Sequence, residues 1–221
     1  VTPATKVIPA TKVTPATKVI PGMKAKMAAI TPSEKPYLKT RVGEIWLARI
    51  PWLLLLMISA TLSSTILSRF EARLASVLIL FVPMLMDTGG NSGSQVSVTV
   101  IRSISLGEID RRSIVPIILK EALCGLMTGA VLAAVAFAKV LLVDRLIMQN
   151  PEVTLAVALA VALALFATVI IAKLTGALLP IAAKGIGLDP AVMASPFITT
   201  LVDTVALILY FFIAAALVGT A

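Results

Sequence analysis

Residues 153–183 read VTLAVALAVALALFATVIIAKLTGALLPIAA, an apolar stretch interrupted by one charged side chain, Lys173. About 20 helical residues cross the ~30 Å hydrocarbon core of a bilayer, so this stretch predicts a transmembrane helix. The sequence as a whole predicts an all-α, multi-pass membrane protein with five transmembrane helices, whose two ends lie on opposite sides of the bilayer. Four further apolar stretches are long enough to span it: residues 46–67, 74–101, 114–143 and 196–218.

The composition of the 221-residue chain excludes several classes of function. Hydrophobic residues make up 59% of the chain and charged residues 14%, whereas about 45–50% and about 25% are usual in soluble domains. The chain has no histidine, which excludes catalysis or metal binding through an imidazole. The single cysteine, Cys124, lies in an apolar stretch, and we expect it to pack rather than to react.

The amino-terminal segment carries most of the formal charge of +8, since residues 1–40 hold seven lysines and one acid. Residues 1–24 are four hexads, each with valine first, proline third and lysine last. Because proline at this spacing blocks a regular helix, we expect residues 1–26 to be an extended or disordered tail. The tail is either a passive linker or leader, or a segment that binds anionic lipid. Residues 27–45 follow as a cytoplasmic or interfacial linker, and residues 46–221 form the five-helix domain.

Basic residues outside the predicted helices indicate the orientation. Twelve lie in the first 45 residues and in the loops 102–113 and 184–195, and three lie on the other side: Arg69, Arg73 and Arg145. The amino terminus is therefore predicted to be cytoplasmic and the carboxyl terminus external, in the cell (inner) membrane. The basic residues form no face interleaved with aromatic side chains, which excludes nucleic acid as a partner.

The last predicted helix contains Asp203, ~10 Å along the helix from Pro196 at a rise of about 1.5 Å per residue. An ionised Asp at this depth costs about 2.5–3.5 kcal/mol, so it should face the bundle interior, water or a cation. Ser195 and Thr199 precede it at four-residue spacing and share its face of the helix, together with Thr200. The alternative is a structural carboxylate neutralised by a basic residue of another helix: Arg49, Lys120 or Lys173.

The second predicted helix contains an unusual polar run, MDTGGNSGSQ, at residues 86–95. A polar row at four-residue spacing is formed by Asp87, Asn91, Gln95 and Thr99. The glycines among them, Gly89, Gly90 and Gly93, allow either close helix packing or local unwinding beside a water-filled cavity. Because four polar residues lie in this row, we favour the second interpretation, in which the segment lies beside a water-filled cavity.

The two polar stripes offer only hard oxygen ligands, which favour Mg2+, Ca2+ or Mn2+ over Zn2+ or Cu2+. One deep Asp is too few to strip Mg2+ of its waters, because this ion dehydrates reluctantly. A two-fold homodimer would bring two copies of Asp203 around one axis, as in the charge rings of cation pores. Gln95 and Thr200 are predicted to line this pore.

Four motifs carry a resemblance to a known family: PMLMDTGGNSGSQ at residues 83–95, LGEI at 106–109, GLDP at 187–190 and SPFITTLVD at 195–203. Over residues 40–221 the chain resembles the transmembrane domain of the MgtE magnesium channels and their eukaryotic solute-carrier relatives. The resemblance implies a homodimer in the lipid bilayer with a pore on its two-fold axis for hydrated Mg2+. The cytoplasmic helical domain and CBS pair found in many members do not precede the first span in this sequence, so the resemblance does not extend to gating by them.

The resemblance also implies roles for particular residues. Asp203 matches the pore acid that holds hydrated Mg2+, and Thr199 and Ser195 line the same site. Asn91, with the neighbouring Gly89 and Gly90, matches the pore-lining segment of the second helix. Ser195 stands where some members carry Asn. Asp87 stands where several members have Gly, so we expect an added cation site near the outer mouth.

Three other interpretations compete with a magnesium channel. An aspartic protease needs two carboxylates that share a proton, and the Asp87-Thr88-Gly89 triplet occurs once, so we predict that the chain is not an enzyme. A Na+- or H+-coupled divalent-cation carrier on the same helices stays open, although five spans do not divide into equal repeats. A scaffold without transport would leave the deep polar stripes unexplained. Selectivity among Mg2+, Mn2+, Co2+ and Ca2+ also stays open.

Overall fold

A computed structural model of the chain describes residues 37–71, 76–188, 190 and 195–219. All regular structure in these ranges is helical, as predicted. The predicted tail, residues 1–26, and most of the linker lie outside the described residues. The described ranges contain six α-helices in chain order: α1 (Val42–Glu71), α2 (Ser76–Ile79), α3 (Val82–Ser105), α4 (Ile114–Lys139), α5 (Leu155–Gly185) and α6 (Ser195–Leu217). Short 3-10 turns precede α1 and α4, at Tyr37–Lys39 and Arg111–Ser113, and a π-helix, Val140–Ile147, extends α4.

Among the described residues, four helical segments are long and apolar enough to cross a membrane: Val42–Arg69, Ile114–Ile147, Leu155–Gly185 and Pro196–Leu217. They correspond to four of the five predicted spans. The remaining predicted span, residues 74–101, contains α3. This helix has 24 residues, but it carries the polar row and is not apolar enough to be recognised as a membrane span by composition.

The predicted span 74–101 is not one helix, and this prediction is wrong in its details. A turn at Leu80 and Phe81 separates α2 from α3, which continues to Ser105. Pro83 lies in the first turn of α3, where its missing N–H is not needed and its fixed φ suits a helix start. The turn between α2 and α3 contacts α6 through a hydrogen bond, in which the Tyr210 hydroxyl donates to the Leu78 carbonyl at 2.8 Å.

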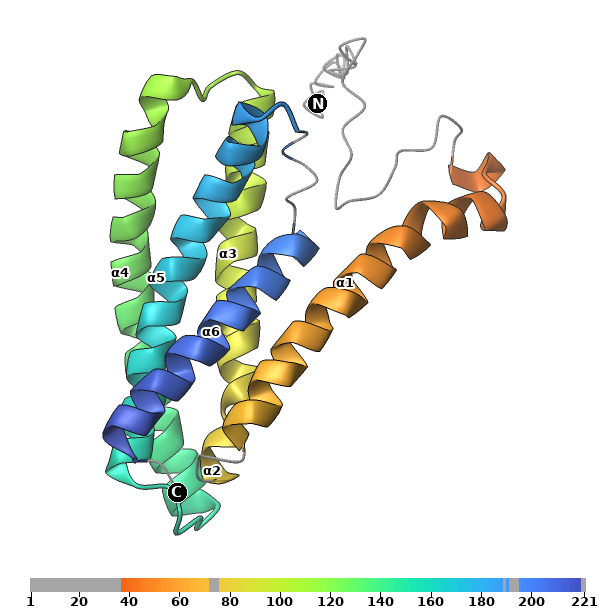
Figure 1. Cartoon of the computed structure of the whole chain (residues 1–221). Coiled ribbons are helices and arrows are strands. Elements are labelled where there is room, and N and C mark those ends of the chain that lie inside the picture. The colour runs from red at the N-terminus through yellow and green to blue at the C-terminus, as the bar shows by residue number, and fades with distance from the viewer. Residues whose placement is uncertain (1–36, 72–75, 189, 191–194, 220–221) are drawn as a thin grey trace, which may run out of the picture.

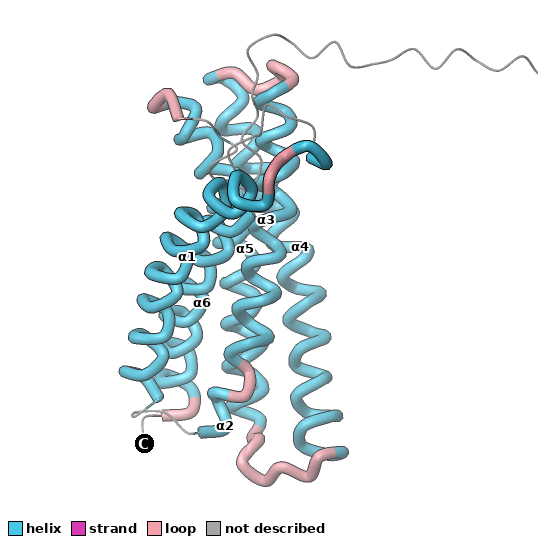
Figure 2. Tube along the Cα trace, turned by 90° about the vertical axis from the view of Figure 1, so that its right-hand side faces the viewer, coloured by secondary structure: helices cyan, strands magenta, loops and turns pink. Residues whose placement is uncertain are grey.

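The helices form a bundle with one diverging member. In Figure 1, α3, α4 and α5 stand close together, α6 crosses them obliquely, and α1 leans away toward its amino-terminal end. Figure 2, turned by 90°, shows α1 and α6 running along the same side of the bundle. Near its carboxyl-terminal end α1 meets α6, where the Ser63 and Thr204 hydroxyl oxygens lie 3.1 Å apart.

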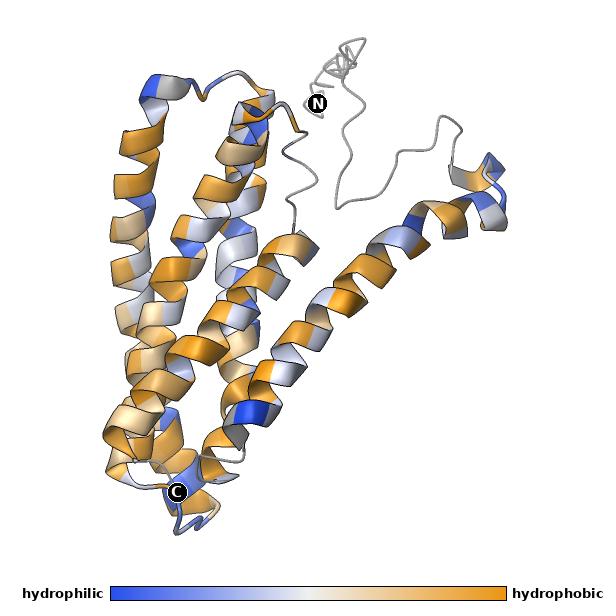
Figure 3. Cartoon of the chain, viewed as in Figure 1, coloured by the Kyte–Doolittle hydropathy of each residue, from blue (hydrophilic) through white to orange (hydrophobic). Residues whose placement is uncertain are grey.

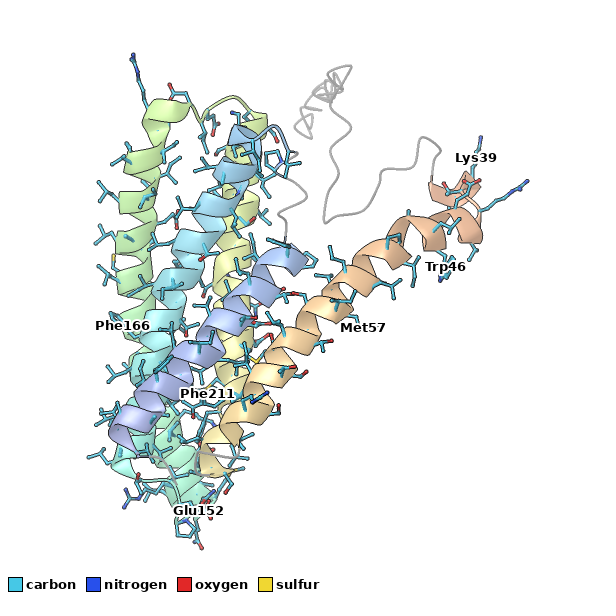
Figure 4. The ribbon with its side chains drawn as sticks, in the orientation of Figure 1. Lys39, Trp46, Met57, Glu152, Phe166 and Phe211 are labelled. Carbon is cyan, nitrogen blue, oxygen red and sulfur yellow. The ribbon has the colours of Figure 1, made fainter. Side chains whose placement is uncertain are left out.

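The apolar core lies mainly at the end of the bundle where α1 and α6 finish. Phe81, Tyr210 and Phe211 are fully buried there, with Leu78 of α2. Figure 4 labels Phe211 within this end. The outer surfaces of α1 and α4 are also apolar, as the orange ribbons of Figure 3 show, and Met57 is 63% exposed. Exposed apolar surface of this extent suits helices that face lipid.

The connections alternate between the two ends of the bundle. In Figure 1 the amino-terminal end of α1 lies at the same end as the α3–α4 loop, and the carboxyl-terminal end of α6 lies at the other. Around the α3–α4 loop, the Asp110 carboxylate caps the following turn through the backbone N–H groups of Arg112 and Ser113, both at 2.9 Å. Lys184, at the end of α5, donates to the Ile109 carbonyl at 3.1 Å. Lys184 and the α3–α4 loop that carries Arg112 therefore lie at the same end of the bundle.

Candidate cation site

The centre of the candidate site is the Asp203 carboxylate, which is half-buried on α6 where this helix passes α3. A Cβ atom on Gly90 would lie 3.4 Å from Asp203 Oδ1 and 3.0 Å from Thr199 Cγ2. The absence of a side chain at Gly90 therefore allows the backbone of α3 to approach the carboxylate. Three of the predicted site residues, Asp203, Thr199 and Gly90, therefore lie close together.

The other glycines of α3 serve close packing. A Cβ atom on Gly89 would lie 2.6 Å from Thr168 Cγ2 on α5, and one on Gly93 would lie 3.0 Å from the Ala172 carbonyl oxygen. Gly176 of α5 faces the Gly93 backbone so closely that a Cβ atom there would collide with it. Because α3 runs as a regular helix through Gly93, these glycines serve packing and the helix is not unwound there. The water-filled cavity that the polar row favours stays a prediction.

The threonines before Asp203 have their hydroxyl protons engaged within α6. Thr199 Oγ1 and Thr200 Oγ1 both donate to the Pro196 carbonyl at 2.9 Å. Their oxygen lone pairs remain as acceptors, which is the polarity that a cation or its water shell requires. Ser195 is the first residue of α6, and its side chain lies outside the described residues.

A cavity of about 260 Å³ opens beside Asp203, between α1, α3 and α6. Its lining residues are Ala60, Ser63, Ser64, Leu67, Met86, Thr200, Asp203 and Leu207. The α1 serines were not predicted to belong to the site. Their signal is a Thr61-Leu62-Ser63-Ser64-Thr65 run inside an apolar span, which is weak because the run holds no charge.

The outer face of α3 carries the polar row predicted from the sequence. Asp87, Asn91 and Gln95 are exposed along this helix, as is Thr99. A hollow of about 650 Å³ lies over the face and is lined by Asn91, Ser94, Gln95, Val98 and Thr99. Asp87 stands about one turn before Gly90 on the same helix.

The structural alternative for Asp203 was neutralisation by a basic residue. Within the described part of the chain, Asp203 forms no ion pair with Arg49, Lys120 or Lys173. Lys173 is buried on α5, with 8% of its surface exposed. The described residues also hold no group of three or more acidic, cysteine or histidine side chains that could bind a metal. In this part of the chain, one copy offers too few charged ligands to enclose a bare cation.

The apolar helices, with a half-buried carboxylate and acceptor hydroxyls between them, define a membrane protein with a site suited to a hydrated cation. The profile of the MgtE family, described as divalent cation transporters, matches residues 82–213. The chain belongs to this family. The match excludes α1 and covers α3, α4, α5 and most of α6, including Asp203.

Three relatives, each named magnesium transporter MgtE, are similar to most of the chain. The protein of Thermus thermophilus is 33% identical over 87% of this chain, that of Bacillus subtilis 35% over 77%, and that of Enterococcus faecalis 31% over 76%. The chain spans about two fifths of their lengths, 41%, 36% and 36% respectively. The three names describe magnesium transport, which agrees with the prediction that the chain is not an enzyme.

Proposed function

We propose that the chain is the transmembrane domain of a magnesium channel, in which two copies enclose a pore for hydrated Mg2+ on a two-fold axis. The observation that carries this proposal is the exposed polar face of α3 beside the half-buried Asp203. Polar side chains facing lipid are costly, so a face of this kind needs water and a protein partner to cover it. A second copy of the same chain is the simplest such partner, because a two-fold axis pairs identical surfaces.

In this proposal α3 is the fifth membrane span. With 24 residues at about 1.5 Å each it is ~36 Å long, enough to cross the bilayer. Its polarity reflects its place at the pore, whereas α1 and α4 face lipid. The amino terminus is cytoplasmic and the carboxyl terminus external, as the distribution of basic residues predicts.

The residues take the following roles. Asp203 of each copy is the principal cation-binding group, and it acts through retained water because Mg2+ dehydrates reluctantly. Thr199, Ser195 and Asn91 line the same site. Asp87 adds a second carboxylate from each copy. The other pore-lining positions are Gly89, Gly90, Gln95 and Thr200.

The test is Mg2+ flux into liposomes that contain the purified chain and a Mg2+-sensitive dye. Asp203→Asn keeps the shape of the side chain and removes its charge, so we expect at least a tenfold loss of flux, as a cost of about 1.4 kcal/mol would give. Glu152→Gln is the matched control, because Glu152 is exposed in the α4–α5 connection. Wild-type flux in the Asp203→Asn variant would contradict the proposal.

The same preparation separates a channel from a coupled carrier. A channel should pass Mg2+ at a rate that follows the imposed voltage and needs no second gradient. Uptake that saturates, ignores voltage and requires a Na+ or proton gradient would instead identify a carrier.

A further inference from the structure

The cavity between α1, α3 and α6 has a defined hydrogen-bonding polarity. Thr204 Oγ1 donates to the Thr200 carbonyl at 3.0 Å, and it also lies 3.1 Å from Ser63 Oγ. A hydroxyl has one proton, so Thr204 must accept from Ser63, and Ser63 is the donor in this contact. A relay therefore runs from α1 into α6, from Ser63 through Thr204 to the Thr200 carbonyl.

The other hydroxyl groups at the cavity also donate their protons to backbone carbonyl oxygens. Ser64 Oγ donates to the Thr61 carbonyl at 3.0 Å, and Thr200 Oγ1 donates to the Pro196 carbonyl at 2.9 Å. Each hydroxyl oxygen consequently keeps lone pairs for a further partner. Together with the Asp203 carboxylate, the polar side-chain oxygens that line the cavity are acceptors.

A cavity with this polarity suits the water shell of a cation. Waters bound to a cation point their oxygens inward and their hydrogens outward, so they act as donors to their surroundings. Six waters occupy about 180 Å³ at their share of liquid volume, about 30 Å³ each. A cavity of about 260 Å³ in each copy therefore has room for the part of the shell that faces it when the ion lies between two copies.

We propose that α1 is part of the cation site: Ser63 positions α6 through Thr204, and Ser63 and Ser64 accept hydrogen bonds from the water shell of a divalent cation at Asp203. This inference rests on the proposed function, since it assigns a further helix to the same site. Ser63 is 8% exposed, and its partner Thr204 lies 141 residues further along the chain, so the hydrogen bond reflects tertiary structure.

The experiment compares the Mg2+ concentration for half-maximal flux among variants in liposomes. Ser63→Ala and Thr204→Val should each raise this concentration about three- to tenfold, as expected for one lost hydrogen bond, with the maximal flux within about twofold of wild type. The double variant should be no worse than Ser63→Ala alone, because Thr204→Val removes a contact that Ser63→Ala has already removed. Ser63→Thr and Thr204→Ser, which keep the hydroxyl, should restore wild-type behaviour.

The matched control is Ser68→Ala. Ser68 is exposed on α1, donates to the Thr65 carbonyl within its own helix at 2.9 Å, and does not line the cavity. If Ser63→Ala and Thr204→Val behave like Ser68→Ala while Asp203→Asn lowers flux, this inference is overturned and the proposed function stands. If Asp203→Asn has no effect, the proposed function itself fails. Thermal unfolding in detergent shows whether each variant is folded.

Discussion

At the scale of single residues, the candidate site depends both on the carboxylate of Asp203 and on the absence of a side chain at Gly90. Asp203 supplies the charge, but the backbone of α3 reaches it because Gly90 has no side chain. The hydroxyls of Thr199 and Thr200 donate their protons to one carbonyl of their own helix, so they can only accept further hydrogen bonds. One charge and several neutral acceptors suit an ion that keeps its water.

Gly90→Ala tests the close approach of α3 to Asp203. The added Cβ atom would meet Thr199 Cγ2 at 3.0 Å, so α6 has to shift by a few tenths of an ångström, and we expect a clear loss of Mg2+ flux. Gly43→Ala on α1 is the control, because a Cβ atom there meets nothing within 4 Å. The measurement is liposome flux, and equal flux in the two variants would mean that the α3–α6 spacing does not control the site.

At the scale of helices, contacts between glycines and the facing backbone set how closely the helices of the bundle pack. Gly125 and Gly129 of α4 face Ile170 and Phe166 of α5, with Cβ positions 3.1 Å from the nearest atoms. Figure 4 labels Phe166 on the α5 ribbon. On its other side α5 meets α3 at Gly176 and Gly93. The central helix α5 is therefore held on two sides by small residues, which suits helix association within lipid.

Gly176→Ala should be the most disruptive of the small substitutions in the bundle. Its Cβ atom would collide with the Gly93 backbone, which cannot move aside as a flexible side chain could. We expect a loss of about 1–3 kcal/mol of stability, the usual cost of overpacking. The measurement is unfolding in detergent. Gly185→Ala, at the end of the same helix with open space around it, should leave stability nearly unchanged.

At the scale of the whole molecule, the surface of one copy has apolar regions and a polar region. The surfaces of α1 and α4 are apolar and suited to lipid, whereas the outer face of α3 is polar and lies over a hollow of about 650 Å³. The difference predicts which face meets the second copy. Although α1 diverges from the bundle in Figure 1, its carboxyl-terminal half contacts α6 beside the site, so this helix borders both lipid and the cavity.

Cross-linking tests the predicted dimer face. In a Cys124→Ala background, Asn91→Cys on α3 should be joined to its counterpart by a flexible bis-maleimide reagent in native membranes, because the two-fold axis pairs identical positions. Leu119→Cys is the control, since Leu119 is 65% exposed on α4 and should face lipid. Dimer bands on denaturing gels measure the result. Cross-linking through position 119 but not through position 91 would contradict the proposed interface.

The sequence by itself determined that the chain is a helical membrane protein, and it located the candidate site. Apolar stretches are local signals, because each span must satisfy its own backbone within the bilayer. Polar side chains inside such stretches are local signals too, because each one carries an energetic cost at its own depth. Asp203 and the row from Asp87 to Thr99 are therefore recognisable from composition and spacing alone.

Only the tertiary structure decided what surrounds those residues. The turn that divides the predicted second span, the use of the α3 glycines for packing, and the place of Ser63 beside Asp203 all depend on contacts between distant helices. A serine in an apolar helix carries little signal of its own, because its effect depends on which oxygen of another helix it meets. Local composition determines which segments span the membrane, whereas packing between distant helices determines which side chains each residue contacts.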